Sequence, residues 1–422
     1  MPAPATNDPV HARAFAADVV ARLRQAGYES YWAGGCVRDD LLGRTPVDYD
    51  VATAARPDDV RRLFGRGRTI AVGAAFGVIT VLGPESAGQV EVATFRSDAA
   101  YTDGRHPAGI TFCSAREDAS RRDFTINGLF LDPVSGSVID FVAGREDLAA
   151  GVIRAIGVPA QRFGEDHLRM LRGIRFAAAF GFVLEDQTRA AIERLGHLVA
   201  SVSPERIAAE LRAMVERPGR LRALELLAET GLAAVVLPEF FGPGVAAAAG
   251  WPAAAAIVDA LDEPDLPLAL ATLAEGQQVL LVERSGARLR LANREVAKAT
   301  WLHAAILAIG RPTTADLAGR PWSTIQPLVA HPLAASLADL LRARAVRGVG
   351  ATADAAWFTA QVARPRIEID PPPLLTGADL LAAGIPAGRG LGRALETVRA
   401  LQLDGRIGTR DEALDAARSA AG

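Results

Sequence analysis

The chain has 422 residues, which is more than one ordinary domain, so we expect two to four packed domains. Half of the residues are hydrophobic, and this excludes disordered and fibrous architectures. The formal net charge of −3 at pH 7 excludes a bulk polycation, so a nucleic-acid partner would have to meet local basic patches.

Cysteine usage and hydrophobic patterning point to the compartment. Two cysteines, Cys36 and Cys113, are too few for a disulfide framework or a four-thiolate zinc site, and they indicate a reducing cytoplasm. The N-terminus lacks the pattern of a signal peptide. The most apolar stretch, residues 245–261, is shorter than the roughly 20 apolar residues of a membrane span. We therefore expect a soluble cytoplasmic protein that does not enter a membrane.

Lysine is almost absent from the chain, because Lys298 is the only one among 46 basic residues. Composition bias of the genome is the simplest explanation. The skew still excludes a phosphate-loop lysine or a Schiff-base lysine before position 298.

The first 150 residues alternate between helix and strand patterns. Apolar residues at helical spacing predict a helix over residues 10–26, and a short aromatic run predicts the strand that follows. A double glycine then ends this strand and begins the next helix. The remaining predicted elements are a helix over 36–42, a strand over 46–52, and a hairpin of 69–82 with 89–96. Residues 1–150 therefore read as α/β.

Beyond Arg154 the sequence changes to long Ala/Leu/Arg segments with a 3.6-residue period, which predict a wholly helical remainder. The proline-rich residues 364–373 are expected to form a linker into a small final helical unit.

A pair of carboxylates stands at Asp48 and Asp50. Residues two apart on a strand point to the same face, so both carboxylates share one side of the predicted strand. They would repel each other unless cations neutralise them, and Mg²⁺ prefers a few carboxylates together with substrate phosphates. Two-metal nucleotidyl transfer uses this arrangement. An Asp-x-Asp by itself is common at strand ends.

A glycine turn lies just upstream of these carboxylates. Gly34 and Gly35 would let the backbone approach phosphate oxygens at a helix N-terminus, and Arg38 could clamp a triphosphate. A simple turn beside a surface arginine is the alternative. Glu91, on a neighbouring predicted strand, either supplies a third carboxylate or faces solvent, and the sequence leaves both open.

Two further clusters carry arginine. In residues 121–127, Arg122 could hold phosphate, while Asp123 and Asn127 could bind a ribose or brace the loop; a capped helix start is the alternative. In residues 165–176, one helical stripe would carry the functional side chains Asp166, Arg169, Arg172 and Arg175.

The helical stripe also has two interpretations. An exposed ion-pair ladder would contribute only tenths of a kcal/mol. Three arginines against one aspartate nevertheless leave unpaired positive charge, which suits a triphosphate, and a carboxylate with a guanidinium can present donors and acceptors to the edge of a base.

Taken together, these segments resemble the class II nucleotidyltransferases, which comprise CCA-adding tRNA nucleotidyltransferases and bacterial poly(A) polymerases within the polymerase beta-like superfamily. The motifs that carry the resemblance are residues 34–39, 48–50, 94–96, 103–107, 121–127, 140–147, 164–176 and 203–210.

The resemblance implies roles for these residues. Asp48 and Asp50 would hold two catalytic Mg²⁺ ions, and Gly34, Gly35 and Arg38 would contact the incoming nucleotide. The other implied nucleotide-binding residues are Arg122, the base-selecting pair Asp166 and Arg169, and the triphosphate-binding Arg172 and Arg175. The segment over residues 96–121 would be a flexible loop that helps to switch specificity from C to A.

The implied fold is α+β. A head with a five-stranded mixed sheet over residues 1–150 would precede an all-helical neck (151–220), body (221–363) and tRNA-binding tail (364–422). Candidate tRNA contacts in the body are Arg284, Arg288, Arg290, Arg294, Arg342, Arg344 and Arg347, with solvated helix faces as the alternative.

The expected activity is addition of C, C and A to the 3′ end of tRNA from CTP and ATP, without a nucleic-acid template and with release of pyrophosphate. The expected partner is the acceptor arm and 3′ end of tRNA, and no obligate protein partner can be read. Alternatives are an A-adding or CC-adding enzyme, a poly(A) polymerase, or a non-catalytic tRNA-binding module.

Overall fold

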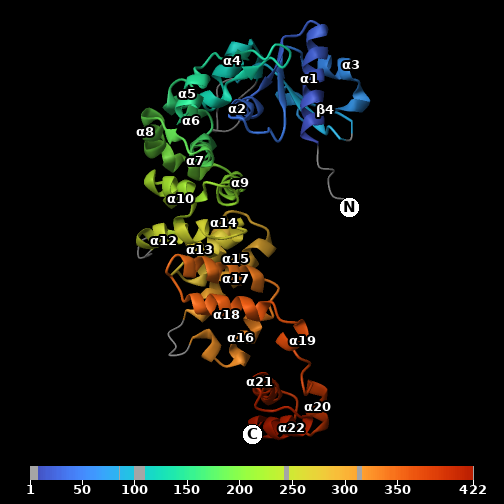
Figure 1. Ribbon diagram of the computed structural model, residues 1–422, viewed down its shortest axis with the longest axis vertical. Helices are drawn as coiled ribbons and strands as arrows, with labels where there is room; N and C mark the ends of the chain where they lie inside the picture. Colours follow the sequence, from blue (N-terminus) through green and yellow to red (C-terminus); the bar gives the residue numbers. More distant parts are fainter. Residues whose placement is uncertain (1–7, 85, 99–109, 242–246, 311–315, 422) are drawn as a thin grey trace. The chain divides into compact units, whose positions relative to one another are not determined.

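The structure is a computed structural model that describes residues 8–84, 86–98, 110–241, 247–310 and 316–421 (Figure 1). The chain divides into two compact units, Met1–Val236 and Leu237–Gly422. Within the described part, no helix combines the length and the apolar character needed to cross a membrane. The predicted α+β class, a head with a mixed sheet followed by helices, is confirmed.

A mixed sheet forms the centre of the first unit. Its strand order is β3-β4-β5-β2-β1-β8-β9, in which β2 and β5 are parallel and all other neighbours are antiparallel. The strands are β1 (Ser30–Ala33), β2 (Asp50–Thr53), β3 (Thr69–Ile70), β4 (Val78–Leu82), β5 (Gln89–Thr94), β8 (Phe130–Leu131) and β9 (Val138–Ile139). The predicted hairpin is confirmed for β4 and β5, but the single strand expected over residues 69–82 is divided into β3 and β4. The described sheet exceeds the expected five strands because the two-residue strands β3 and β9 extend its edges.

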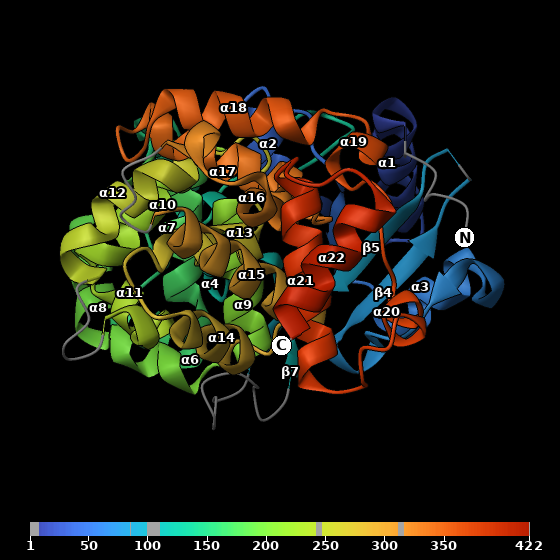
Figure 2. The same ribbon diagram turned by 90° about the horizontal axis from the view of Figure 1, so that it is seen from below.

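Helices pack on this sheet and lead away from it. Helix α1 begins at Pro9 after the N-cap Asp8, whose carboxylate accepts a hydrogen bond from the Val10 N–H at 2.9 Å, and it packs across β1, β2 and β5. Helix α3 lies beside β4 and β5 (Figures 1 and 2). The elements are α1 (Pro9–Gln25), α2 (Gly35–Leu41), α3 (Pro57–Phe64), α4 (Ala115–Ser120), α5 (Gly144–Ala150), and the separate antiparallel pair β6 (Arg96–Asp98) and β7 (Ile110–Phe112).

The rest of the first unit is helical with one exception. Its helices are α6 (Pro159–Glu165), α7 (Leu168–Phe180), α8 (Asp186–Leu195), α9 (Pro204–Val215), α10 (Arg220–Glu229) and α11 (Leu232–Val236). The prediction of a wholly helical remainder misses β11 (Val183–Leu184), which pairs in parallel with β10 (Val152–Ile153). Two residues are too few to show a strand period, so only the pairing reveals this strand.

The second unit consists of helices around two hydrophobic clusters. The larger cluster runs from Ile257 to Ile369, and the smaller from Leu375 to Ala417. The helices are α12 (Ala247–Asp259), α13 (Leu266–Leu273), α14 (Val279–Arg288), α15 (Asn293–Ile309), α16 (Trp322–Val329), α17 (Ala334–Val346), α18 (Thr352–Val362), α19 (Arg366–Ile369), α20 (Gly377–Ala382), α21 (Arg389–Leu403) and α22 (Arg410–Ala421).

The linker predicted over residues 364–373 is only partly extended. Its first half forms α19, whose Ile369 is 4% exposed and joins the larger cluster. Its prolines are held by α21, because Arg399 donates to the carbonyl of Pro371 at 2.8 Å and Gln402 to that of Pro372 at 2.7 Å. Apolar burial and these hydrogen bonds fix a segment that composition alone marks as a free linker.

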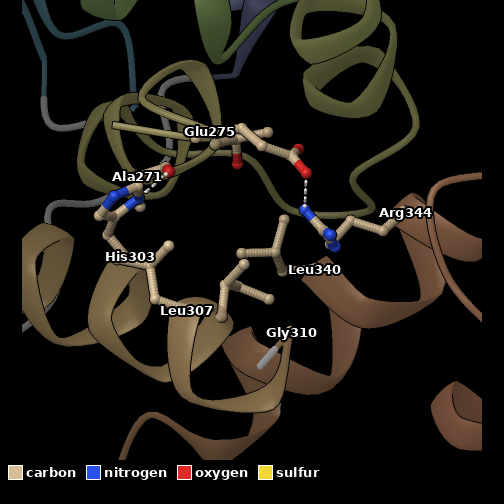
Figure 3. A pocket seen from close by; sticks show the side chains of 10 residues that line it. Ala271, Glu275, His303, Leu307, Gly310, Leu340 and Arg344 are labelled. Carbon is tan, nitrogen blue, oxygen red and sulfur yellow. Dashed lines mark hydrogen bonds and ion pairs between the residues drawn. The ribbon is translucent and has the colours of Figure 1, made fainter. Parts of the chain in front are cut away.

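A small cavity of about 230 Å³ lies among α13, α15 and α17. Figure 3 shows His303 at one side of it and an ion pair between Glu275 and Arg344 at the other. The buried ring of His303 lies between two backbone carbonyls, those of Ala271 and Gln277, each at 3.0 Å. The polar groups of this cavity are therefore used in holding the helices together.

Candidate functional site

One open pocket of about 670 Å³ in the first unit collects every site residue that the sequence predicts. Its size lies within the range of small-ligand sites. The predicted residues that line it are Gly34, Gly35, Arg38, Asp48, Asp50, Arg122, Asp166, Arg169, Arg172 and Arg175. Motifs that are up to 141 positions apart in the sequence thus meet in a single site.

The two carboxylates stand where β2 begins. The strand predicted over residues 46–52 starts only at Asp50, and Asp48 lies in the bend before it, so the strand prediction is wrong for Asp48. Both still face the pocket, because Tyr49 between them turns the other way, is 3% exposed and packs on Trp32 with ring centroids 4.7 Å apart. The alternation that motivated the prediction therefore holds, although the regular strand is shorter.

The surroundings of Asp50 oppose its ionisation. Burial of the carboxyl group, reinforced by the negative charges of Asp48 and Glu91 and opposed by Arg122, raises the pKa of Asp50 to about 6. Glu91 is paired with Asp50 in the parallel β2–β5 register, but its side chain is exposed. Among the described residues, no three His, Cys, Asp or Glu side chains form a group that could hold a metal ion. The donor set in the pocket is thus the pair Asp48 and Asp50.

The turn between β1 and α2 depends on glycine. Gly34 has φ of 72°, a conformation that favours glycine, and a Cβ there would lie 2.9 Å from Nη1 of Arg122. Gly35 starts α2, and a Cβ on it would meet nothing closer than 3.7 Å. Backbone and guanidinium therefore lie in close contact at Gly34, whereas Gly35 has room.

A hydrogen-bonded chain fixes Arg38 to α7. Arg38, which is 8% exposed, donates to Oδ1 of Asn127 at 2.7 Å, and Nδ2 of Asn127 donates to Asp123 at 3.0 Å. Asp123 in turn accepts from Nε of Arg172 at 2.8 Å. Burial opposes ionisation of Asp123, but Arg172 and these hydrogen bonds outweigh it and lower the pKa of Asp123 to about 2. Asp123 and Asn127 therefore brace the pocket, which was one of the two roles that the sequence allowed.

Arg121 and Arg122 share one buried carboxylate. Asp118 is 2% exposed and accepts from Arg121 at 2.7 Å and from Arg122 at 2.9 Å. Burial opposes its ionisation, yet the two guanidinium groups prevail and keep the pKa of Asp118 below its ordinary value. Two cations against one anion leave excess positive charge beside Gly34.

The prediction that Asp166 shares a helical stripe with the arginines of α7 is wrong. Asp166 follows α6 with extended backbone (φ −146°, ψ 107°) and precedes α7. Its Oδ1 accepts from the Leu168 N–H at 3.1 Å, which helps to start α7, and its Oδ2 accepts from Arg206 of α9 at 2.6 Å. The carboxylate is held at the helix start by its own backbone and by a distant arginine.

The arginines of α7 are not left unpaired, in contrast to the sequence-based expectation. Arg169 pairs with Glu165 at 2.5 Å, Arg172 with Asp123 at 2.8 Å, and Arg175 with Glu210 at 2.6 Å. Counting charges within residues 165–176 misses two of these three partners, because Asp123 and Glu210 lie outside that segment.

The pocket is nevertheless cationic. Seven arginines and four aspartates line it, an excess of three positive charges. The other lining residues are Arg121, Asp123, Asn127, Leu168, Phe176 and Arg206. Arg121 and Arg206 lie within the family motifs, so proximity to a motif was the available signal, but only the fold shows that Arg206 reaches Asp166. This arrangement suits a polyanion beside a divalent cation.

Two other predictions concern loops and the second unit. Of the flexible loop expected over residues 96–121, residues 99–109 lie outside the described residues, and the described parts form β6, β7 and α4. Of the seven candidate tRNA-binding arginines, four have acidic partners: Arg288 with Glu239, Arg342 with Asp262 and Asp339, Arg344 with Glu275, and Arg347 with Asp259. Arg284 and Arg294 are exposed and have no ion-pair partner among the described residues.

Comparisons with known proteins agree with these motifs. Residues 30–154 match the family described as "Poly A polymerase head domain", and residues 181–241 match "Probable RNA and SrmB- binding site of polymerase A". A CCA-adding enzyme of Geobacillus stearothermophilus is 43% identical over 239 residues, which are 56% of this chain and 58% of that protein. The CCA-adding enzyme of Enterococcus faecalis is 43% identical over 216 residues, 51% and 52% of the two chains. The aligned part thus spans little more than half the length of these curated relatives.

Solved structures extend the likeness along the chain. The Bacillus stearothermophilus CCA-adding enzyme in complex with CTP matches with a TM-score of 0.73 and 29% identity over 98% of both chains. The Thermotoga maritima CCA-adding enzyme complexed with tRNA matches with a TM-score of 0.67 at 20% identity over 97% of this chain and 95% of that one, which shows the fold alone. Motifs, pocket, sequence relatives and fold thus agree in their likeness to the class II family of CCA-adding tRNA nucleotidyltransferases and bacterial poly(A) polymerases.

Proposed function

We propose that the chain is a CCA-adding tRNA nucleotidyltransferase, which adds C, C and A to the 3′ end of tRNA from CTP and ATP. The observation that carries the proposal is the single pocket in which two adjacent carboxylates face seven arginines. The relatives named above are CCA-adding enzymes, and one of them is solved with CTP. A cytoplasmic location accords with the small number of cysteines, Cys36 and Cys113, and with the proposed substrate.

Asp48 and Asp50 are the proposed metal-binding and catalytic residues. They fit a divalent cation because both are oxygen donors. Burial, together with the negative charges of Asp48 and Glu91, raises the pKa of Asp50, and a bound cation would relieve that repulsion. Two Mg²⁺ ions, when bound, would activate the attacking oxygen and neutralise the charge that develops on the leaving group. The chain's contribution is to fix the two carboxylates at the start of a buried strand.

The arginines are the proposed triphosphate contacts. Arg122 is held against Gly34 by Asp118, while Arg38, Arg172 and Arg175 are oriented by Asn127, Asp123 and Glu210 respectively. Guanidinium groups held by buried partners present their remaining N–H donors without a large loss of side-chain freedom. The 3′ hydroxyl of tRNA would then attack the α-phosphate of a positioned nucleotide, and pyrophosphate would leave.

Asp166 and Arg169 are the proposed base-selecting pair. A guanidinium has five N–H donors, and three of those of Arg169 are engaged by Glu165 and by the carbonyls of Arg162 and Arg121. Each carboxylate oxygen of Asp166 already accepts one hydrogen bond and retains a second lone pair. Two donors and two acceptors thus remain in fixed positions for the Watson–Crick edge of a base.

The proposed functions of the four domains are those of the family. Head (1–150) and neck (151–220) would carry the chemistry, and body (221–363) and tail (364–422) would bind tRNA. The neck residues Asp166 and Arg169 line the same pocket as the head residues.

Extension of defined tRNA transcripts tests the proposal. Purified protein with Mg²⁺ is incubated with transcripts that end before CCA, after C and after CC, with CTP, ATP or both, and the products are sequenced. The expected result is a completed CCA end on all three. Activity confined to the CC-ended transcript, to the unfinished transcripts or to long A tails would replace the proposal by an A-adding, CC-adding or polyadenylating enzyme.

A double substitution separates an enzyme from a binding module. Asp48→Ala with Asp50→Ala should abolish incorporation and retain tRNA binding, as measured by filter retention of labelled tRNA. Absence of incorporation by the unsubstituted protein, with tRNA binding intact, would indicate a non-catalytic module.

A further inference from the structure

A second open pocket, of about 660 Å³, lies in the second unit among α13, α15 and the segment before α17. It is nearly as large as the catalytic pocket and shares no residue with it. Its lining residues with aromatic or charged side chains are Asp265, Arg294, Glu295, Lys298, Trp301 and His331.

Two rings form a stack in this pocket. Trp301 and His331 are parallel within 10°, with ring centroids 3.7 Å apart. Both are only half-buried and both line the pocket, in contrast to the fully buried aromatic rings of the cores. A flat, partly exposed pair of rings is a surface on which a further planar group can stack.

The imidazole of His331 is held in a neutral form. Its Nδ1 accepts a hydrogen bond from the Leu333 N–H at 3.2 Å, and burial lowers the pKa of His331 below its ordinary value. The remaining proton therefore sits on Nε2, which has no partner among the described residues. The stack thus offers a planar surface together with one free N–H donor.

Charged groups surround the stack. The sole lysine of the chain, Lys298, is 2.6 Å from Oδ2 of Asp265, so an ammonium donor and a carboxylate acceptor lie together in the pocket. Arg294 is exposed and unpaired within the described residues, and is free to meet a phosphate. The small cavity of Figure 3 lacks this combination, because its Arg344 is paired with Glu275 and its His303 is buried.

We propose that this pocket binds one unpaired nucleotide of an RNA strand, with the base extending the Trp301–His331 stack on its outer face, its edge toward Lys298 and Asp265, and a phosphate on Arg294. Unstacked bases in RNA are recognised by this combination of ring stacking, edge hydrogen bonds and a guanidinium. The RNA is tRNA, and this identification rests on the proposed function. The site would hold the substrate at a point other than the growing 3′ end.

Equilibrium binding of a labelled tRNA transcript that ends before CCA, without CTP or ATP, tests the site. Trp301→Leu keeps apolar packing and removes the ring, and His331→Ala removes the second ring. Each should raise the Kd for tRNA by about 5- to 100-fold, the usual effect of losing one stacked base. Trp301→Phe and His331→Phe should restore most of the affinity. Arg294→Ala should reduce the slope of log K against log salt by about one.

Matched controls separate stacking from general damage. Trp322→Leu alters another half-buried tryptophan that packs on the same hydrophobic cluster outside the pocket, and Arg66→Ala removes an exposed arginine of the first unit. Both should bind tRNA as the unsubstituted protein does. The Kd for CTP and the thermal midpoint of each variant report whether the fold is intact.

The outcomes distinguish this site from the proposed function. Folded Trp301→Leu and His331→Ala variants with an unchanged Kd for tRNA would overturn the nucleotide site, even if the protein completes CCA ends. A Trp301-dependent Kd in a protein that extends no transcript would retain the site and overturn the proposed activity. Cross-links from 4-thiouridine-substituted tRNA should map to the peptides that contain Trp301 and His331, and their absence from both would also contradict the proposal.

Discussion

The carboxyl group of Asp50 lies where protein atoms and two neighbouring acids oppose its ionisation. Its pKa of about 6 in the folded chain exceeds the ordinary value of 3.8, so the folded state holds the proton more tightly than the unfolded chain does. The favourable contribution of the protonated group is complete below about pH 4 and is lost as the pH rises through 6. At neutral pH, ionised Asp50 therefore destabilises the cation-free protein.

The raised pKa of Asp50 leads to a prediction about the pH dependence of stability. Asp50→Asn should stabilise the cation-free protein by about 1–2 kcal/mol at pH 7.5, after allowance for solvent screening in an open pocket, and by much less at pH 4.5. Urea unfolding in the presence of a chelator measures both values. Added Mg²⁺ should stabilise the unsubstituted protein at pH 7.5 but not the variant. An equal effect of the substitution at both pH values would contradict the electrostatic cause.

The proposed base-selecting role of Arg169 also depends on single hydrogen bonds. Arg169→Ala removes the two donors that remain for a base, so discrimination of CTP and ATP against UTP and GTP should fall by about tenfold or more. Competition between nucleotides in the extension assay measures the ratio. Arg189→Ala, which breaks a partly exposed ion pair of α8 outside the pocket, is the control and should leave the ratio unchanged. An unaltered preference in Arg169→Ala would exclude the proposed role.

At the scale of elements, the turn from β1 into α2 places backbone against the guanidinium of Arg122. Gly34 has a positive φ, which strains any residue with a side chain, and a Cβ at this position would lie only 2.9 Å from Nη1 of Arg122, so that guanidinium would have to shift. Gly35, one residue later, lies in a regular helix with space around it.

Adjacent glycines should therefore respond differently to the same change. Gly34→Ala should lower the free energy of unfolding by about 1–3 kcal/mol and raise the KM for CTP, because Arg122 must move. Gly35→Ala should be nearly neutral for stability, since alanine favours a helix. Chemical denaturation and initial rates at varied CTP measure these effects. Equal losses in both variants would show that the turn, rather than the contact with Arg122, matters.

At the scale of the whole molecule, the two compact units divide the named sites between them. All lining residues of the pocket around Asp48 and Asp50 belong to Met1–Val236, whereas the Trp301–His331 pocket belongs to Leu237–Gly422. Each unit has its own buried core, so the chemistry and the proposed RNA site can be tested separately.

A fragment of residues 1–236 should keep the nucleotide site and lose substrate affinity. Its Kd for CTP with Mg²⁺ should lie within about threefold of that of the full chain, while its KM for tRNA should rise by about tenfold or more, because counterion-releasing contacts of the second unit are gone. Calorimetry and transcript extension measure the two quantities. A cooperatively folded fragment that binds no CTP would mean that the second unit completes the nucleotide site.

Much of the fold and of the candidate site could be predicted from the sequence, because both depend on short local patterns. Helix and strand patterns predicted an α/β first part and a helical remainder. The resemblance to the class II family, which its motifs carry, implied the α+β class and the ten pocket residues. The secondary-structure predictions were wrong where only one or two residues determine the local structure. Strand β11 is two residues long, and Asp166 lies outside the helix and accepts a hydrogen bond from the Leu168 N–H at the start of α7.

The tertiary structure determined which charged side chains pair with each other. Arg206 with Asp166, Asp123 with Arg172 and Glu210 with Arg175 join elements 35 to 49 positions apart, and no spacing rule connects such residues. The same holds for the stack of Trp301 on His331, whose rings come from different elements. A sequence by itself determines periodicity, turns and the kinds of chemistry available, because these depend on neighbouring residues. Which charges are neutralised, which are left for substrate and which rings stay exposed depend on packing between distant segments, and only the folded chain settles them.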